Sequence, residues 1–236
     1  MHLKALLLII FSFILSGPLR AQDAAPPLYL LDFVFLNDGM TIDDHSAYNA
    51  QAAPIAARYG INLIATLDPL NITDGPDSLA RVDIWTLPSQ QALVQWGADP
   101  EFIAMEPEIA RIHDMHNLTL YVAENVLSPD VSPGTAYHLE LLTVSQERWN
   151  REAFINYILS VDEIAESHGI IRQASLSGLD RLTGDGPTAN WFSLYSVPGP
   201  DEYSAMAEDP RMTALNDTRY SLFVRENALQ GAFLAQ

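Results

Sequence analysis

The sequence carries one pattern twice, and an internal repeat restricts the possible architectures more than composition does. The pattern is Gly-Ile after an aromatic or His residue, then a strand that ends in Pro, then Asp-Pro at a helix start. The first copy is at Tyr59-Gly60-Ile61, Pro88 and Asp99-Pro100, and the second is at His168-Gly169-Ile170, Pro198 and Asp209-Pro210. The two Pro residues lie 110 residues apart, as do the two Asp-Pro pairs. The chain is therefore expected to fold as two equivalent halves.

Residues 1–21 resemble a signal peptide. Lys4 precedes an apolar run of about eleven residues, which Ser16-Gly17-Pro18 interrupts before Ala21 offers a cleavage site. A helix that crosses a bilayer needs roughly 20 apolar residues, so a cleaved leader is favoured over the alternative, an uncleaved anchor. The chain has no Cys, which excludes disulfides, thiolate metal sites and a lipidated Cys. We expect a periplasmic or secreted protein with no membrane attachment after cleavage.

The formal net charge is -18 at pH 7. Affinity for nucleic acids and for anionic membranes comes mainly from Lys and Arg, so neither is an expected partner. The excess of acidic residues is interpreted as a solubility feature of the surface.

Hydrophobic periodicity predicts the order βαββαβ in each half. The first unit spans 28–126, a Pro-rich linker spans 127–135, and the second unit spans 136–236. Loops are expected at 68–78 and 179–187, a helix at 200–217 and the last strand at 219–225. The order βαββαβ is that of the ferredoxin-like fold, in which both helices cover one face of an antiparallel sheet. We expect the two bare sheet faces to cover each other in an intramolecular pseudo-dimeric α+β barrel, because exposing either would forfeit apolar burial. An internal pair leaves further oligomerisation open.

The first half is similar to members of the dimeric α+β barrel superfamily, and most similar to a small bacterial group of unestablished function within it. The matching residues are Tyr59-Gly60, Trp85-Thr86-Leu87-Pro88-Ser89, the helix through Ala92 and Trp96, and Asp99-Pro100-Glu101-Phe102. The resemblance implies the fold; the superfamily includes cofactor-free monooxygenases, small isomerases and haem enzymes, so it implies activity far less strongly.

Strand alternation sorts the candidate site residues. Leu30 and Asp32 share one face of the first strand, which we assign to the side of the partner sheet, and Tyr29, Leu31, Phe33 and Phe35 are assigned to the helix side. Asp32 and Glu140 are equivalent in the repeat and are expected to act as proton acceptors, with His138 as a proton shuttle. Further inward-facing residues are expected to bind a planar ligand, and these are Arg81, Asp83, Trp85, Trp191 and Tyr195. The alternative is a structural set in which these groups satisfy one another or are solvated.

No metal site and no cofactor are expected. His113 and His116 have a possible ligand spacing, but His at a helix C-terminus is better explained by the helix dipole. His45 and His168 lie on helix faces that should meet the sheet. A proximal His in a doubled unit of this kind suits haem, yet the sequence context does not support it.

Three functions remain open. The first is an exported protein that binds a small, aromatic molecule in the barrel cavity. The second is a cofactor-independent monooxygenase or isomerase acting on a small aromatic or quinone-like substrate. The third is a non-binding protein with a barrel filled by side chains.

Overall fold

The structure is a computed structural model that describes residues 27–185 and 189–236. The predicted signal peptide, residues 1–21, and the end of the predicted loop at 179–187 lie outside the described residues. Among the described helices, none combines the length and the apolar character that crossing a membrane requires.

The described elements follow the predicted order in both halves. The first half contains β1 (Leu28–Phe35), α2 (Ile42–Ala57), β2 (Asn62–Asp74), β3 (Leu79–Leu87), α3 (Gln90–Gly97), α4 (Pro100–Ala104), α5 (Glu106–Ile112) and β4 (Thr119–Leu127). The second half contains β5 (Ala136–Val144), α6 (Arg151–Ser167), β6 (Ile171–Thr183), β7 (Trp191–Ser196), α7 (Pro200–Ala207), α8 (Pro210–Ala214), α9 (Asn216–Leu222) and β8 (Phe223–Ala235).

The strands form a closed barrel in the order β1-β3-β2-β8-β5-β7-β6-β4. The pairs β1 with β3, β1 with β4, β5 with β7 and β5 with β8 are all antiparallel. The predicted fold class, an α+β barrel of two ferredoxin-like units, is confirmed.

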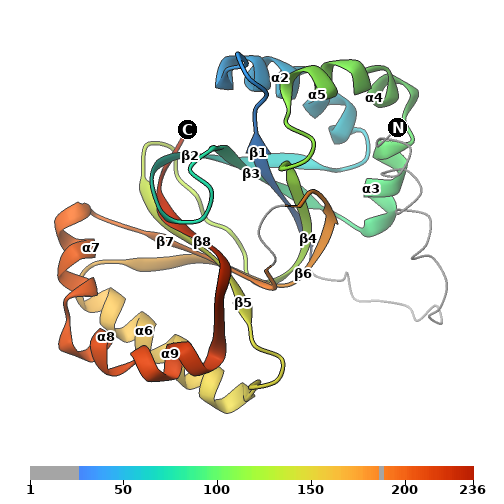
Figure 1. The fold of residues 1–236 in the computed structure, drawn as a ribbon. Coiled ribbons are helices and arrows are strands. Elements are labelled where there is room, and N and C mark those ends of the chain that lie inside the picture. The colour runs from blue at the N-terminus through green and yellow to red at the C-terminus, as the bar shows by residue number, and fades with distance from the viewer. Residues whose placement is uncertain (1–26, 186–188) are drawn as a thin grey trace, which may run out of the picture. The chain divides into compact units, whose positions relative to one another are not determined.

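The described chain divides into two compact units. Unit 1 comprises residues 27–66, 78–125 and 180–185, and unit 2 comprises residues 67–77, 126–179 and 189–236. In unit 1 the helices α2 to α5 cover one face of the strands, and in unit 2 α6 to α9 do the same (Figure 1).

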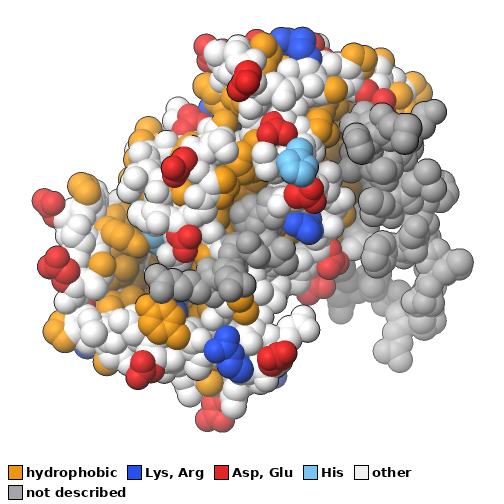
Figure 2. Space-filling view, in the orientation of Figure 1, with side chains coloured by type: hydrophobic (Ala, Val, Ile, Leu, Met, Phe, Trp, Pro, Cys, Tyr) orange, Lys and Arg blue, Asp and Glu red, His pale blue; other side chains and the backbone are white. Residues whose placement is uncertain are grey.

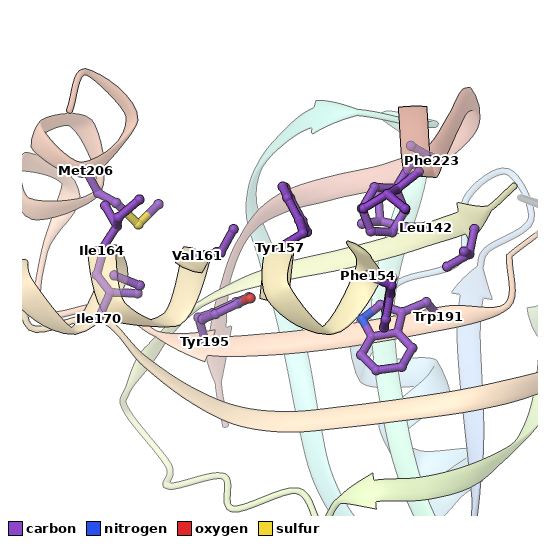
Figure 3. Packing of buried hydrophobic residues seen from close by; sticks show 14 residues of the cluster. Leu142, Phe154, Tyr157, Val161, Ile164, Ile170, Trp191, Tyr195, Met206 and Phe223 are labelled. Carbon is purple, nitrogen blue, oxygen red and sulfur yellow. The ribbon is translucent and has the colours of Figure 1, made fainter. Parts of the chain in front are cut away.

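Each unit has its own apolar core between its strands and helices. In unit 1, Leu30 of β1 and Trp85 of β3 pack against Ile55 and Ala56 of α2. In unit 2, Leu142 of β5 packs in one cluster with side chains from α6 and β7. Figure 3 shows Phe154, Trp191 and Phe223 gathered at one end of α6 and Met206 at the other. These cores position the side chains of the sites described below.

Helix α2 begins at a capping box. Thr41 is the N-cap of α2, its hydroxyl accepts from the backbone N–H of Asp44, and the Asp44 carboxylate accepts from the backbone N–H of Thr41. This reciprocal capping box satisfies two of the free donors at the helix start. The helix continues through Pro54 to Ala57.

Three predicted boundaries are wrong. The segment 68–74 is not a loop, because β2 continues to Asp74 and pairs with β8, and β6 likewise continues to Thr183. Pro69 is tolerated in β2 because the pairing register shifts between Pro69 and Asn71. Residues Asn216–Leu222 form α9, so the last strand starts at Phe223 and runs to Ala235. The partner strand β8, distant in sequence, supplies the hydrogen bonds that make residues 68–74 a strand.

Acidic side chains are scattered over the face of the molecule shown in Figure 2, and they do not gather in one patch there. This distribution is compatible with the interpretation of the net charge as a solubility feature.

Candidate functional site

Unit 1 contains a cavity of about 120 Å³ between its strands and its helices. Its walls are mostly aromatic and aliphatic, and they include Leu30, Tyr48, Trp85, Leu93, Trp96 and Phe102. An apolar protein cavity of roughly 150 Å³ accepts a benzene ring, so this cavity matches a ligand of about one ring.

The predicted assignment of the sheet faces is wrong. Asp32 lines this cavity together with Tyr48 and Ala52 of α2, so the face that carries Leu30 and Asp32 is the one that the helices cover. Alternation could not decide between the faces, because both rows of β1 are mainly apolar. The polar side chains of α2 identify the covered face, because they contact the acidic side chains of the strands.

Two acidic side chains lie side by side on the sheet, and one of them, Asp32, lines this cavity. Asp32 of β1 is the direct cross-strand partner of Asp83 of β3, so both side chains project from the same face of the sheet. Within the described part of the chain, the Oδ1 atoms of both residues are buried and have no hydrogen-bond partner. Burial, and after it the charge of Asp83, raises the pKa of Asp32 well above its usual range. An Asp with a raised pKa at the wall of a cavity is a candidate for proton transfer.

A chain of buried hydrogen bonds extends from Asp83. Asn49 donates from Nδ2 to Asp83 Oδ2 at 2.6 Å, and His45 Nε2 lies 2.9 Å from the same oxygen. His45 Nδ1 lies 2.8 Å from His113 Nε2, and His113 Nδ1 lies 3.1 Å from the carbonyl oxygen of Ile109. Asp83 and His45 are fully buried. The start of α2 and the end of α5 thus supply the two imidazoles.

The last hydrogen bond of this series, between His113 and Ile109, determines the direction of the bonds before it. A carbonyl oxygen only accepts, so His113 Nδ1 carries a proton and donates it to Ile109. Burial and the proximity of His45 lower the pKa of His113 to about 4, so at pH 7 its Nε2 is an acceptor and His45 Nδ1 is the donor. His45 Nε2 then lies against Asp83 Oδ2 at 2.9 Å and Asn49 Nδ2 at 3.1 Å. Asp83 is therefore held in a fixed pair, and of these two carboxyl groups it is Asp32 that lines the cavity.

The remaining predicted residues of unit 1 lie on the same face. Arg81 is buried and donates from Nη1 to Ser46 Oγ of α2 at 3.0 Å. Trp85 forms part of the cavity wall. The structure therefore brings Asp32, Asp83 and Trp85 together as expected, but beneath the helices of one unit.

Unit 2 holds a separate cavity of about 180 Å³, again between strands and helices. The predicted residues His138, Glu140, Trp191 and Tyr195 line it. Glu140 therefore does not share a cavity with Asp32, and the expected convergence of the two acids is wrong. The physical reason is again the inverted face, because each acid is covered by the helices of its own unit.

The environment of Glu140 is opposite to that of Asp32. Burial by itself would raise the pKa of Glu140, but the neighbouring His138 and the charge of Arg219 lower it to about 2. Glu140 Oε1 lies 3.3 Å from Arg219 Nη2, 3.1 Å from Gln230 Nε2 and 3.8 Å from His138 Nε2. Glu140 is thus ionised and its charge is balanced by neighbouring groups, whereas the Asp32 carboxyl has a raised pKa and no described residue donates to its Oδ1 atom.

Corresponding residues of the two units can be identified from the helix ends. The N-caps Thr41 and Asn150 lie 109 residues apart, and the C-caps His113 and Phe223 lie 110 apart. His45 therefore corresponds to Phe154. The ring centroids of His45 and His113 are 5.1 Å apart, and those of Phe154 and Phe223 are 6.0 Å apart. Unit 2 therefore places two Phe rings where unit 1 has its two imidazoles (Figure 3).

The lowered pKa of His113 yields a stability prediction, and the corresponding Phe223 supplies the variant that tests it. The pKa of His113 is lowered from 6.5 to about 4, so the unfolded chain binds the proton more tightly and stability falls as pH drops through this window. The loss should reach about 3 kcal/mol at pH 4. Urea unfolding of the parent chain and of His113→Phe, at pH 7 and at pH 4, measures it. The parent should lose more stability than the variant, and equal losses would contradict a buried neutral His113.

The sequence prediction missed His45, Asn49 and His113 as members of the site. The sequence predicts that His45 lies on a helix face that meets the sheet. From this, a contact between His45 and an acidic residue of the third strand could have been predicted. The position of His113 at a helix end suggests only an interaction with the helix dipole, and its partner His45 lies 68 residues away in the sequence. His116 lies at the surface beside Asp185 and does not join His113.

No protein-family profile matches this sequence, and no curated protein matches it. Solved structures do match. An anthrone oxidase-like protein has 14% identity and a TM-score of 0.63, covering 92% of this chain and 94% of its own. A proposed monooxygenase from Lactobacillus acidophilus has 11% identity and a TM-score of 0.52, covering 89% and 94%. A heme-binding protein from Thermus thermophilus has 10% identity and a TM-score of 0.50, covering 89% and 91%. The predicted resemblance to one small bacterial group stays a prediction.

The two cavities described above do not fit haem. Haem iron is commonly held by a His nitrogen, and in unit 1 both ring nitrogens of His45 and of His113 are engaged by protein groups. In unit 2, His138 Nε2 lies 3.3 Å from the Tyr203 hydroxyl, and the cavity of about 180 Å³ is small for a macrocycle. Cavities for drug-sized ligands measure roughly 300–1,000 Å³. Among the described residues there is also no cluster of three or more His, Asp or Glu that could hold a metal ion.

At these identities the similarity concerns the fold and not the chemistry. The matches cover nearly the whole of this chain and nearly the whole of each neighbour, and the strand order found here is a closed barrel of eight strands. The chain therefore has the fold of the dimeric α+β barrel proteins.

Proposed function

We propose that unit 1 binds a small, single-ring aromatic or quinone-like molecule and acts on it as a cofactor-independent monooxygenase with Asp32 as the proton acceptor. The observation that carries the proposal is the uncompensated carboxyl of Asp32 at the wall of an aromatic cavity, with Asp83 held behind it. The solved structures of an anthrone oxidase-like protein and of a proposed monooxygenase share the fold, which is compatible with this chemistry.

The cavity suits the proposed substrate class. Trp85, Trp96 and Tyr48 offer aromatic faces against which a planar ring can stack. A volume of about 120 Å³ selects one ring over fused systems. Because the walls are mainly apolar, a neutral ring enters more easily than a charged one.

The reaction balances without an added reductant. In the ionised state Asp32 takes the proton of a ring hydroxyl of a hydroquinone, and the electron-rich anion reacts with O2 at an adjacent ring carbon. The O–O bond then breaks, one oxygen stays on the ring as the new oxygen of a hydroxyquinone, and the other leaves as water. The hydroquinone supplies both electrons and both hydrogens of that water. A group that first accepts and then returns a proton works best with a pKa near the working pH, and the raised pKa of Asp32 moves it in that direction.

The test combines binding and turnover. The purified chain is heated with hydroquinone, catechol and 1,4-naphthohydroquinone, and oxygen uptake is followed with an electrode after subtraction of autoxidation. A ligand of the native state raises the melting temperature, and one-ring compounds should do so more than the two-ring compound. Oxygen uptake should exceed the background only for compounds that bind. The exposed acid Glu124 of β4 provides the matched control, and Glu124→Gln should behave like the parent.

Two outcomes would count against the proposal. Proton exchange into a bound ring without oxygen uptake would favour the isomerase alternative. Binding without either reaction would leave the non-catalytic binding protein as the function. Export remains a prediction from residues 1–21.

A further inference from the structure

The polar residues around the acid are at different corresponding positions in the two units. In unit 1 the acid of the first strand is backed by Asp83, His45, Asn49 and His113, and the corresponding residues of unit 2 are Ser193, Phe154, Ile158 and Phe223. In unit 2 the acid is surrounded by His138, Tyr203, Arg219 and Gln230, and the corresponding residues of unit 1 are Leu30, Leu93, Ile109 and Leu120. Both units therefore have an acid at this position of the first strand. The neighbouring positions that are polar in one unit are mostly apolar in the other.

The fold does not require the polar set of unit 2. Unit 1 fills the corresponding positions with apolar side chains, three of which are Leu30, Leu93 and Ile109, and forms the same elements. Replacing a buried ion pair with apolar residues is often neutral or stabilising, because desolvation of the charges is costly. The ion pair of Glu140 and Arg219 is therefore not needed to fill this part of the fold, which points to a role in function.

We infer that the cavity of unit 2 is a second ligand site, for a small monocarboxylate of about one ring, with Arg219 as the residue that binds the carboxylate. This site is distinct from the proton-transfer site proposed for unit 1, and the inference does not depend on that proposal.

The balance of donors and acceptors determines the sign of the ligand. Glu140 accepts hydrogen bonds from Arg219 and Gln230 and has His138 nearby, so its charge is compensated. Arg219 by contrast has five N–H donors, and among the described residues it contacts Glu140 through one bond of 3.3 Å and the hydroxyl of Tyr157. The guanidinium therefore has spare donors, and it lines the cavity. A carboxylate matches the planar fork of a guanidinium.

The walls determine the size and shape of the ligand. Trp191, Tyr195 and Tyr157 line the cavity beside Arg219, and Asn216 and Thr213 add short polar side chains at its edge. Arg172 lies behind Tyr195, with its Cζ atom 4.4 Å from the ring centroid, and is paired with Asp162. A ring that carries one carboxylate can place its ring against the aromatic walls and its charge at Arg219. A cationic ligand in this cavity would be repelled by the positive charge of Arg219.

The experiment uses isothermal titration of the purified chain with benzoate, benzyl alcohol and benzylamine, which share a ring and differ in charge. Benzoate should bind, and the other two should bind at least about 10-fold more weakly, the ratio that 1.4 kcal/mol gives. Arg219→Ile introduces the residue found at the corresponding position of unit 1 and should weaken benzoate binding by about 10-fold or more. Arg219→Lys keeps the charge and removes the fork, so it should give an intermediate affinity and also guards against misfolding of the first variant.

The same titration on Asp32→Asn separates the two sites. Benzoate affinity unchanged by Asp32→Asn but reduced by both Arg219 variants would support the site in unit 2. Stronger binding of benzylamine than of benzoate, no benzoate binding, or benzoate affinity unchanged in Arg219→Lys and Arg219→Ile would each overturn it. A loss of benzoate binding in Asp32→Asn alone would assign the ligand to unit 1 and overturn the inference.

Discussion

Asp32→Asn is expected to bind the same one-ring compounds as the parent chain while its turnover falls by about 10²- to 10⁴-fold, the usual contribution of a positioned acid–base group. The amide keeps the shape of the side chain and its place in the cavity wall, so stacking against Trp85 is retained. It has no group that can accept a proton from a substrate hydroxyl. Oxygen uptake measures the loss of turnover, and thermal shift with the same compounds measures the retained binding.

The same substitution should stabilise the folded chain at neutral and alkaline pH. The pKa of Asp32 is raised in the folded state, so its protonated form favours folding and the parent chain loses stability as pH rises through that pKa. An amide stays neutral, and its N–H can satisfy the unpartnered Oδ1 of Asp83. We expect a gain of about 1–3 kcal/mol at pH 8, the cost of an unsatisfied buried polar group. At pH 3, below the ordinary pKa of Asp, the difference should disappear.

Urea unfolding of both chains across this pH range checks the sign. A variant that is less stable than the parent at pH 8 would mean that the Asp32 carboxylate has a stabilising partner, and the proposed role would fail with it. Parent-like turnover in Asp32→Asn would remove Asp32 from the mechanism even if the stability result were as expected. Glu124→Gln serves as the control for a simple loss of charge.

Asp83→Ala is expected to destabilise the chain by about 3–5 kcal/mol, because it leaves buried polar partners without their acceptor. His45 Nε2 and Asn49 Nδ2 both contact Asp83 Oδ2, at 2.9 and 2.6 Å, and both side chains are buried. The midpoint of urea unfolding measures the loss. Turnover should fall as well, since Asp32 would lose the neighbour that raises its pKa.

The combined variant Asp83→Ser, His45→Phe and His113→Phe tests whether these residues act as one unit. Unit 2 already has Ser193, Phe154 and Phe223 at the corresponding positions, so the fold can hold these side chains. The triple variant should be more stable than the sum of its single substitutions, by at least the roughly 0.5–3 kcal/mol found for residues in one network. Strict additivity would show that the Asp83–His45–His113 chain is not a coupled network.

Local signals in the sequence predicted most of the elements. The capping box of Thr41 and Asp44 begins α2, and Gly60, which follows this helix, has a φ of +75°. Such local features depend on a few neighbouring residues, so they can be recognised without the rest of the fold. The extension of β2 from residue 68 to Asp74 could not be recognised in this way, because its hydrogen-bond partners lie in β8.

The candidate site was predicted in part. Strand alternation predicts that Asp32, Asp83 and Trp85 belong to the site, and they do share one face of the sheet. Alternation gives which residues share a face, but it cannot tell which face the helices cover when both rows are apolar. His45 and His113 meet across 68 residues of sequence, and no spacing rule relates them.

The repeat and its periodicity, read from the amino-acid sequence alone, determined that this chain forms two ferredoxin-like halves and that each places an acid in the middle of its first strand. Only the tertiary structure decided what surrounds each acid, because a pKa depends on atoms a few ångströms away and those atoms come from helices distant in sequence. In unit 1 these helices bring imidazoles that hold Asp83 and leave Asp32 uncompensated, and in unit 2 they bring Arg219, which keeps Glu140 ionised.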